Sequence, residues 1–203
     1  GRVYIDYGTS KGTAGGIDTG LDISTTSSYS WNLTYNPNAN GGNGAITFSL
    51  NSGTPATLNL ASGHKVEGAT FNRFGLFNQQ ATGDKMDIYF DDLEFNNLTE
   101  TFGAIPNWYG VGNQKTATHN FGYSSTSYSG GSTGEIGGNI VRSSKGIAYY
   151  ASTIDGKNYS LNTLLNSTGK FNVRNSDGSS GVIYGWFNNK EKGWPPKDFM
   201  GVQ

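Results

Sequence analysis

The sequence predicts an all-β protein, an antiparallel β-sandwich or jelly roll with few or no helices. Several short segments alternate apolar and polar residues, which is the pattern of strands with one buried face. Turn-forming residues separate these segments, and 31 of the 203 residues are glycine, which is too many for long helices. Twelve Tyr, 11 Phe and four Trp residues supply the large apolar side chains that a core requires.

The clearest strand is residues 29–35 (YSWNLTY), in which Trp31 and Leu33 share one face and Asn32 lies on the other. This phase places Trp31 in the core. Residues 36–44 are rich in Asn and Gly, which tolerate positive φ, and therefore predict a hairpin loop. Together with strand 29–35, four later strands predict an antiparallel meander of about five strands. These later strands are residues 45–50, 56–60, 71–78 and 85–95.

The strand pattern weakens around residues 96–105, and we place a boundary there, between segments 1–97 and 98–203. Strands are expected in the second segment at residues 139–142, 147–151, 170–174 and 182–187. Residues 194–201 (WPPKDFMG) are not expected to form a central strand, because adjacent prolines remove ladder donors. The second segment either completes the first sandwich or begins another. Residues 1–7 resemble a strand already under way, and both ends look truncated.

Composition excludes several function classes. The formal net charge is −1 and Lys and Arg are not clustered, so no nucleic-acid partner is expected. No apolar run is long enough to cross a bilayer, which excludes membrane insertion by a helix. Cysteine is absent, which excludes disulfides, thiolate metal sites and a cysteine nucleophile.

Three runs of the first segment carry a family resemblance: WNLTYNPNANGGNGAITFSL, GHKVEGATFNRFGLFN and DIYFDDLEF. They resemble the concanavalin A-like (laminin-G/pentraxin-type) sandwich, in the version found in large secreted proteins of polysaccharide-degrading bacteria. The run from NFGYS to WPPKDFMGV is similar to the sequence that follows in those proteins. The resemblance implies a concanavalin A-like fold and a secreted or cell-surface location.

Catalysis by paired acids is the first chemistry to consider. Retaining glycosidases of this fold carry two acidic residues on one strand, and residues 85–95 are the nearest candidate. Simple alternation places Asp87 and Asp91 on one face and Asp92 and Glu94 on the other. The family's Glu-x-Asp-x-x-Glu pattern is missing, and we therefore assign no catalytic residue.

The adjacent carboxylates of Asp91 and Asp92 are the predicted ligands of a structural calcium ion. Ca²⁺ takes six to eight oxygen ligands, and the pair resembles the strand of jelly-roll carbohydrate-binding modules where one carboxylate holds a structural ion. Asp92 is the first choice and Asp91 the second. The alternative is that both aspartates are solvated or accept hydrogen bonds from loop N–H groups.

Carbohydrate binding requires flat aromatic surfaces with amide, carboxylate or guanidinium groups beside them. Glu135 and Arg142 bracket one segment and could meet sugar hydroxyls as a pair. The predicted sugar contacts are Trp108, Tyr109, Glu135, Arg142, Trp186 and Asn188. The alternative for the two tryptophans is a place in the core, where most sandwich aromatics lie.

The sequence therefore predicts a non-catalytic, polysaccharide-binding β-sandwich that works outside the cytoplasm. Two alternatives remain open at this stage. One is a structural or adhesive surface or filament subunit, which would self-associate or contact neighbouring domains of a larger chain. The other is a glycoside hydrolase or polysaccharide lyase without the usual pair of acids.

Overall fold

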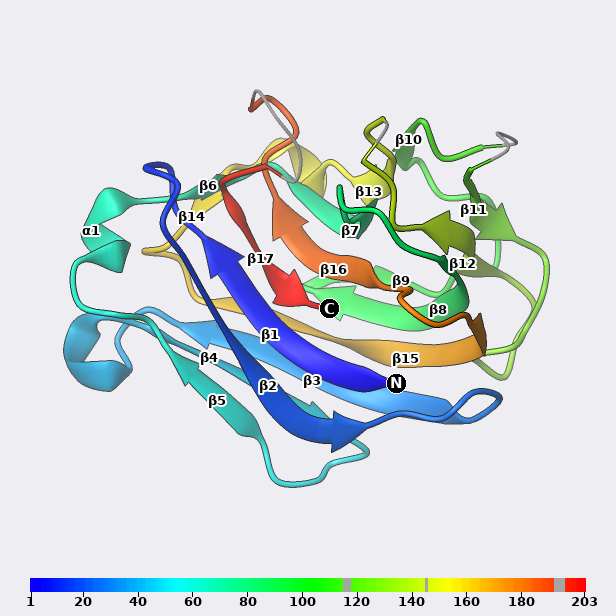
Figure 1. Ribbon diagram of the computed structural model, residues 1–203, viewed down its shortest axis with the longest axis horizontal. Coiled ribbons are helices and arrows are strands. Elements are labelled where there is room, and N and C mark those ends of the chain that lie inside the picture. Colours follow the sequence, from blue (N-terminus) through cyan, green and yellow to red (C-terminus); the bar gives the residue numbers. More distant parts are fainter. Residues whose placement is uncertain (115–117, 145, 192–195) are drawn as a thin grey trace.

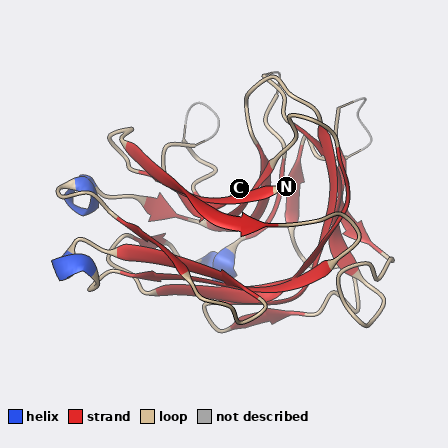
Figure 2. Ribbon diagram, turned by 60° about the horizontal axis from the view of Figure 1, so that its bottom comes forward, coloured by secondary structure: helices blue, strands red, loops and turns tan. Residues whose placement is uncertain are grey.

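The computed structural model describes residues 1–114, 118–144, 146–191 and 196–203. Its strands form two antiparallel sheets stacked as two layers (Figures 1 and 2), which confirms the predicted β-sandwich. The first sheet has seven strands, in the order β10 (Tyr109–Val111), β13 (Tyr149–Ser152), β7 (Arg73–Asn78), β16 (Val182–Phe187), β17 (Phe199–Val202), β1 (Arg2–Gly8) and β2 (Ala14–Asp22).

The second sheet contains eight strands. Seven follow the order β11 (Asn120–Ser124), β12 (Glu135–Val141), β8 (Lys85–Phe95), β15 (Leu165–Ser176), β3 (Ser28–Asn36), β4 (Ala45–Leu50) and β5 (Ala56–Asn59), and β9 (Leu98–Glu100) pairs with β8. The smaller elements are a two-stranded pair, β6 (Thr70–Phe71) with β14 (Tyr159–Ser160), one α-helix, α1 (His64–Glu67), and two 3₁₀ turns, η1 (Asn40–Gly42) and η2 (Ile154–Gly156). Within the described residues, no helix has the length and apolar character needed to span a bilayer.

Both halves of the chain contribute to both sheets. In the first sheet, β7 lies between β13 and β16, and in the second, β15 lies between β8 and β3. The buried cluster at the centre likewise joins residues from both sides of position 97. Of the two arrangements left open by the sequence, this strand order corresponds to one sandwich that the second segment completes.

Strand positions follow the sequence patterns closely, whereas strand neighbours do not. The predicted hairpin is present, because β3 and β4 pair antiparallel across the loop that contains η1. The five-strand meander is wrong, because β7 crosses to the first sheet and β15 separates β8 from β3. The tail prediction is wrong for its described part: β17 pairs with both β16 and β1 and is a central strand. It begins at Phe199, after the prolines, so it keeps its ladder donors; residues 194 and 195 lie outside the described part.

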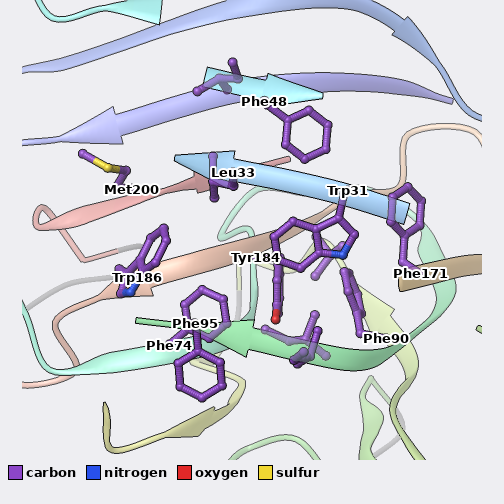
Figure 3. Packing of buried hydrophobic residues seen from close by; sticks show 14 of the residues in the cluster. Trp31, Leu33, Phe48, Phe74, Phe90, Phe95, Phe171, Tyr184, Trp186 and Met200 are labelled. Carbon is purple, nitrogen blue, oxygen red and sulfur yellow. The ribbon is translucent and has the colours of Figure 1, made fainter. Parts of the chain in front are cut away.

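Aromatic side chains dominate the core between the sheets (Figure 3). The rings of Phe90 and Tyr184 stack with their centroids 4.4 Å apart, and the Trp31 ring meets Tyr184 edge-on at 5.2 Å. Trp31 is 4% exposed, which confirms its predicted core position. Such aromatic pairs contribute about 0.5–1.5 kcal/mol each beyond the burial of their area.

Candidate functional site

A β-bulge in β8 decides which acidic side chains share a face. Asp91 pairs with Lys170 and Glu94 pairs with Thr168, so two residues of β8 lie opposite Gly169. Asp92, at φ 50°, is the extra residue, and a bulge of this kind reverses the alternation that follows it. Leu93 therefore joins the core, while Glu94 returns to the outer face. The predicted facing of Glu94 is wrong, because simple alternation assumes an unbroken ladder.

Across the outer face of the second sheet, the strands β11, β12 and β8 lie side by side (Figure 1). Tyr89 pairs with Gly137 on β12, and Gly137 pairs in turn with Gly122 on β11. Two glycines in one row leave an open floor beside the tyrosine ring. A Cβ atom at position 137 would overlap the carbonyl oxygen of Ile88, so this close approach of β12 to β8 requires glycine.

The space beside Tyr89 is a polar groove of about 360 Å³. We call it the Tyr89 groove; it is lined by Tyr89, Gln114, Asn120, Phe121, Gly122, Tyr123, Ser124, Gly137 and Gly138. Its lining combines aromatic rings with amide and hydroxyl groups. These are the groups that bind sugar rings and their hydroxyls.

Residues 125–134, which connect β11 to β12, form a loop beside the groove. The Tyr128 ring meets the Tyr89 ring edge-on with centroids 4.9 Å apart, and the Arg174 guanidinium lies 4.3 Å from the Tyr128 centroid. The Ser28 hydroxyl donates to the Tyr128 carbonyl oxygen at 3.1 Å. These contacts limit the orientations open to Tyr89, so one wall of the groove is held before any ligand arrives.

Glu135 anchors this loop. Its carboxylate accepts the backbone N–H groups of Tyr128 and Ser129 at 2.8 and 2.9 Å, and also the Ser129 hydroxyl. The side chain is fully buried, so the prediction that it contacts sugar is wrong. The predicted partner Arg142 lies beyond the other end of β12, where its Nη1 donates to the Ser179 carbonyl oxygen and hydroxyl. The two residues therefore do not form a pair.

The two aspartates predicted to bind calcium lie in different surroundings. Asp91 is 1% exposed, and its Oδ1 accepts the Asp92 N–H at 2.7 Å. Its Oδ2 packs against Gly130, where a side chain would overlap it. Asp92 is exposed and accepts a hydrogen bond from Lys170 Nζ at 2.6 Å.

This arrangement does not fit a shared calcium ion. One carboxylate is occupied by a lysine ammonium group and the other is enclosed, whereas Ca²⁺ takes six to eight oxygens directed at one point. Over the described ranges, no group of three or more His, Cys, Asp or Glu side chains could hold a metal.

Burial sets the protonation of the outer-face groups. It raises the pKa of Asp91 to about 6, with Asp92 and Glu135 adding to the rise and the Asp92 N–H and Lys170 opposing it. Burial also raises the pKa of the Tyr89 hydroxyl, and the Asp87 carboxylate beside it raises that pKa further. Tyr89 therefore keeps its proton at neutral pH, and its hydroxyl hydrogen-bonds to the Asp87 carboxylate.

We expect Asp91→Asn to stabilise the protein at pH 7.5 by about 1–2 kcal/mol. Folding raises the pKa of Asp91, so the folded protein favours the protonated carboxyl and its ionisation opposes folding. The stability that the protonated form contributes is fully present below pH 4 and is lost as pH rises through 6. Asparagine keeps an oxygen for the Asp92 N–H and cannot ionise. Urea unfolding at pH 4 and pH 7.5 checks this, and the gain should be much smaller at pH 4. Asp92→Asn, which loses only the exposed pair with Lys170, is the control; an equal gain for both variants at both pH values would contradict the assignment.

The remaining predicted sugar contacts are scattered. Trp186 is fully buried and Trp108 is 9% exposed. Trp186 packs on Phe74, whereas Trp108 contacts Phe95, Phe102 and Tyr150. Both belong to the core cluster, so their prediction as exposed stacking platforms is wrong.

Tyr109 lies on the first sheet, and Asn188 directly follows its strand β16. Tyr109, on the edge strand β10, is 55% exposed and has the Arg73 guanidinium 5.9 Å from its ring. The Asn188 amide donates to the Thr70 hydroxyl at 2.9 Å, and its side-chain oxygen accepts the Lys190 N–H. Neither residue lines the Tyr89 groove.

The sequence reasoning missed the groove residues Gln114, Asn120 and Ser124. The available signal was the pairing of NFGYS with EIGGN, where a glycine of one segment lies opposite a glycine of the other. That pairing depends on register, which neither segment reveals alone.

No protein-family model matches the chain, and no curated protein matches it either.

Proposed function

We propose that this protein is a non-catalytic, polysaccharide-binding β-sandwich module that acts at the cell surface or after secretion, with the glycan in the Tyr89 groove. The observation that carries the proposal is the groove lining, in which the Tyr89 ring stands beside amide and hydroxyl side chains over a glycine floor. The aromatic composition and the family resemblance of the sequence agree with it. The location outside the cytoplasm depends on that resemblance alone.

The charges near the groove favour a neutral polysaccharide. Asp87 flanks Tyr89 on β8, and Asp91 and Glu135 lie under the adjoining loop. Carboxylates repel uronic acid or sulfate groups, whereas neutral sugar hydroxyls can both donate and accept at Gln114 and Asn120.

The spacing of Asp87 and Asp91, the two acids that the sequence placed on one face, does not suit catalysis by paired acids. Asp87 and Asp91 stand four residues apart along β8, which is about 13 Å at 3.3 Å per residue. Glycoside hydrolysis by paired acids requires about 5–9.5 Å between carboxyl groups. Glu135 is nearer to Asp91, but its oxygens are committed to the loop.

We expect Tyr89→Ala to weaken binding to a neutral polysaccharide at least tenfold, because it removes the aromatic wall of the groove. Affinity electrophoresis in gels containing xylan, laminarin or β-glucan measures this, with alginate as the acidic comparison. Tyr109→Ala is the matched control, since it removes an exposed tyrosine far from the groove lining. Adding calcium or a chelator should leave retention unchanged.

Two outcomes would overturn parts of this proposal. Equal retention of the Tyr89→Ala and Tyr109→Ala variants, or no retention by any polysaccharide, would contradict binding in the groove. Release of new reducing ends or unsaturated products from a retained polysaccharide would contradict the non-catalytic role.

A further inference from the structure

A second cavity of about 360 Å³ lies inside the sandwich, between the two sheets at the end marked by the turn from β15 to β16. Its walls are mainly apolar and come from both sheets, with Trp31, Phe48, Phe90 and Phe171 from the second and Tyr184 from the first. Figure 3 shows these five rings gathered in the sandwich interior. The cavity is distinct from the Tyr89 groove, which lies on the outer face of the second sheet.

Two polar atoms in this wall lack hydrogen-bond partners within the described part of the chain. They are the Tyr184 hydroxyl and the Trp31 indole nitrogen, and the two side chains are 1% and 4% exposed. Burial raises the pKa of the Tyr184 hydroxyl well above its ordinary value, so both groups are neutral donors at physiological pH. These two donors are the polar points of an otherwise mainly apolar wall.

The lining of the cavity includes an arginine, Arg142, that has no acidic partner among the described residues. Arg142 donates through Nη1 to Ser179 at 3.2 Å, and among the described residues it forms no ion pair and its Nε has no hydrogen-bond acceptor. The other arginine in the lining, Arg2, is already paired with Asp18 and Asp22. Arg142 therefore offers the uncommitted positive charge beside an apolar interior, which suits an anionic head group.

We propose that this cavity binds a small amphiphile with an apolar body and a carboxylate head, of the medium-chain fatty-acid type. The aromatic walls remove the apolar body from water, and Arg142 pairs with the carboxylate. The volume lies within the range of small-molecule sites, about 300–1,000 Å³. The carboxylate distinguishes this ligand from a neutral sugar, so the two sites take different chemistries.

Decanoate and decanol are the probes that test the site. Decanoate should bind saturably, measured by calorimetry and by a change in tryptophan fluorescence, since Trp31 lines the wall. Decanol has a tail of the same length without the charge, and it should bind more weakly. Arg142→Gln should weaken decanoate binding about tenfold while leaving decanol affinity within twofold.

A second pair of variants tests the interior. Val182→Phe fills the cavity from the first sheet and should weaken both probes at least tenfold. Val66→Phe adds the same atoms at a residue that is 92% exposed and should change neither affinity. The proposal is overturned if decanoate does not bind saturably to the folded wild-type protein. It is equally overturned if binding survives both Arg142→Gln and Val182→Phe.

Discussion

Replacing Trp186 with alanine is expected to lower the free energy of unfolding by about 3–5 kcal/mol, the range for large aromatic side chains removed from a core. Trp186 is fully buried, its ring centroid lies 4.9 Å from that of Phe74, and its strand neighbour Met200 is buried as well. The surrounding strands belong to a continuous sheet and cannot collapse freely into the space. Urea or thermal unfolding followed by circular dichroism measures the loss.

Tyr109→Ala is the matched control for that experiment. The Tyr109 side chain is 55% exposed on the edge strand β10, so its removal should change stability by no more than about 0.5 kcal/mol. If Trp186→Ala were as stable as Tyr109→Ala, the indole could not occupy the core. That result would support the prediction that Trp186 contacts sugar.

Glu135→Ala is expected to destabilise the protein by about 3–4 kcal/mol, since hydrogen bonds to a charged group contribute about 1.5–3 kcal/mol each. The variant leaves two backbone N–H groups and the Ser129 hydroxyl without their acceptor. Residues 125–134 should then detach from the sheet. Unfolding measurements give the energy, and hydrogen exchange should show loss of protection at Tyr128 and Ser129.

Glu94→Ala provides the comparison for this variant. Glu94 is exposed on the same outer face, on β8, and its loss should change stability by no more than about 0.5 kcal/mol. If Glu135→Ala lost glycan binding but kept wild-type stability and protection, Glu135 would be a ligand contact rather than a loop anchor. A parallel loss of stability and glycan binding would indicate that the anchored loop positions Tyr89.

Trp186 and Glu135 show why sugar contacts were hard to find in the sequence. Aromatic residues near glycine and asparagine are typical of binding loops, and equally of strands packed on both faces. In β16 every residue is buried, so the strand lacks the alternation that would have assigned Trp186 to the core. A carboxylate within GEIGG likewise gives no sign that a loop will fold over it.

The sequence by itself determined the fold class, most strand positions and the core role of Trp31. Those features depend on local alternation and turn chemistry, which act over a few residues. Strand neighbours, the bulge at Asp91 and Asp92, the glycine row beside Tyr89 and the cavity beside Tyr184 were decided only by the tertiary structure. Each of these depends on the register between strands distant in sequence, and register is set when whole sheets pack. Packing also decided the fate of the predicted sugar contacts. Trp108, Trp186 and Glu135 are buried, and the pairing of β8, β12 and β11 forms the Tyr89 groove instead.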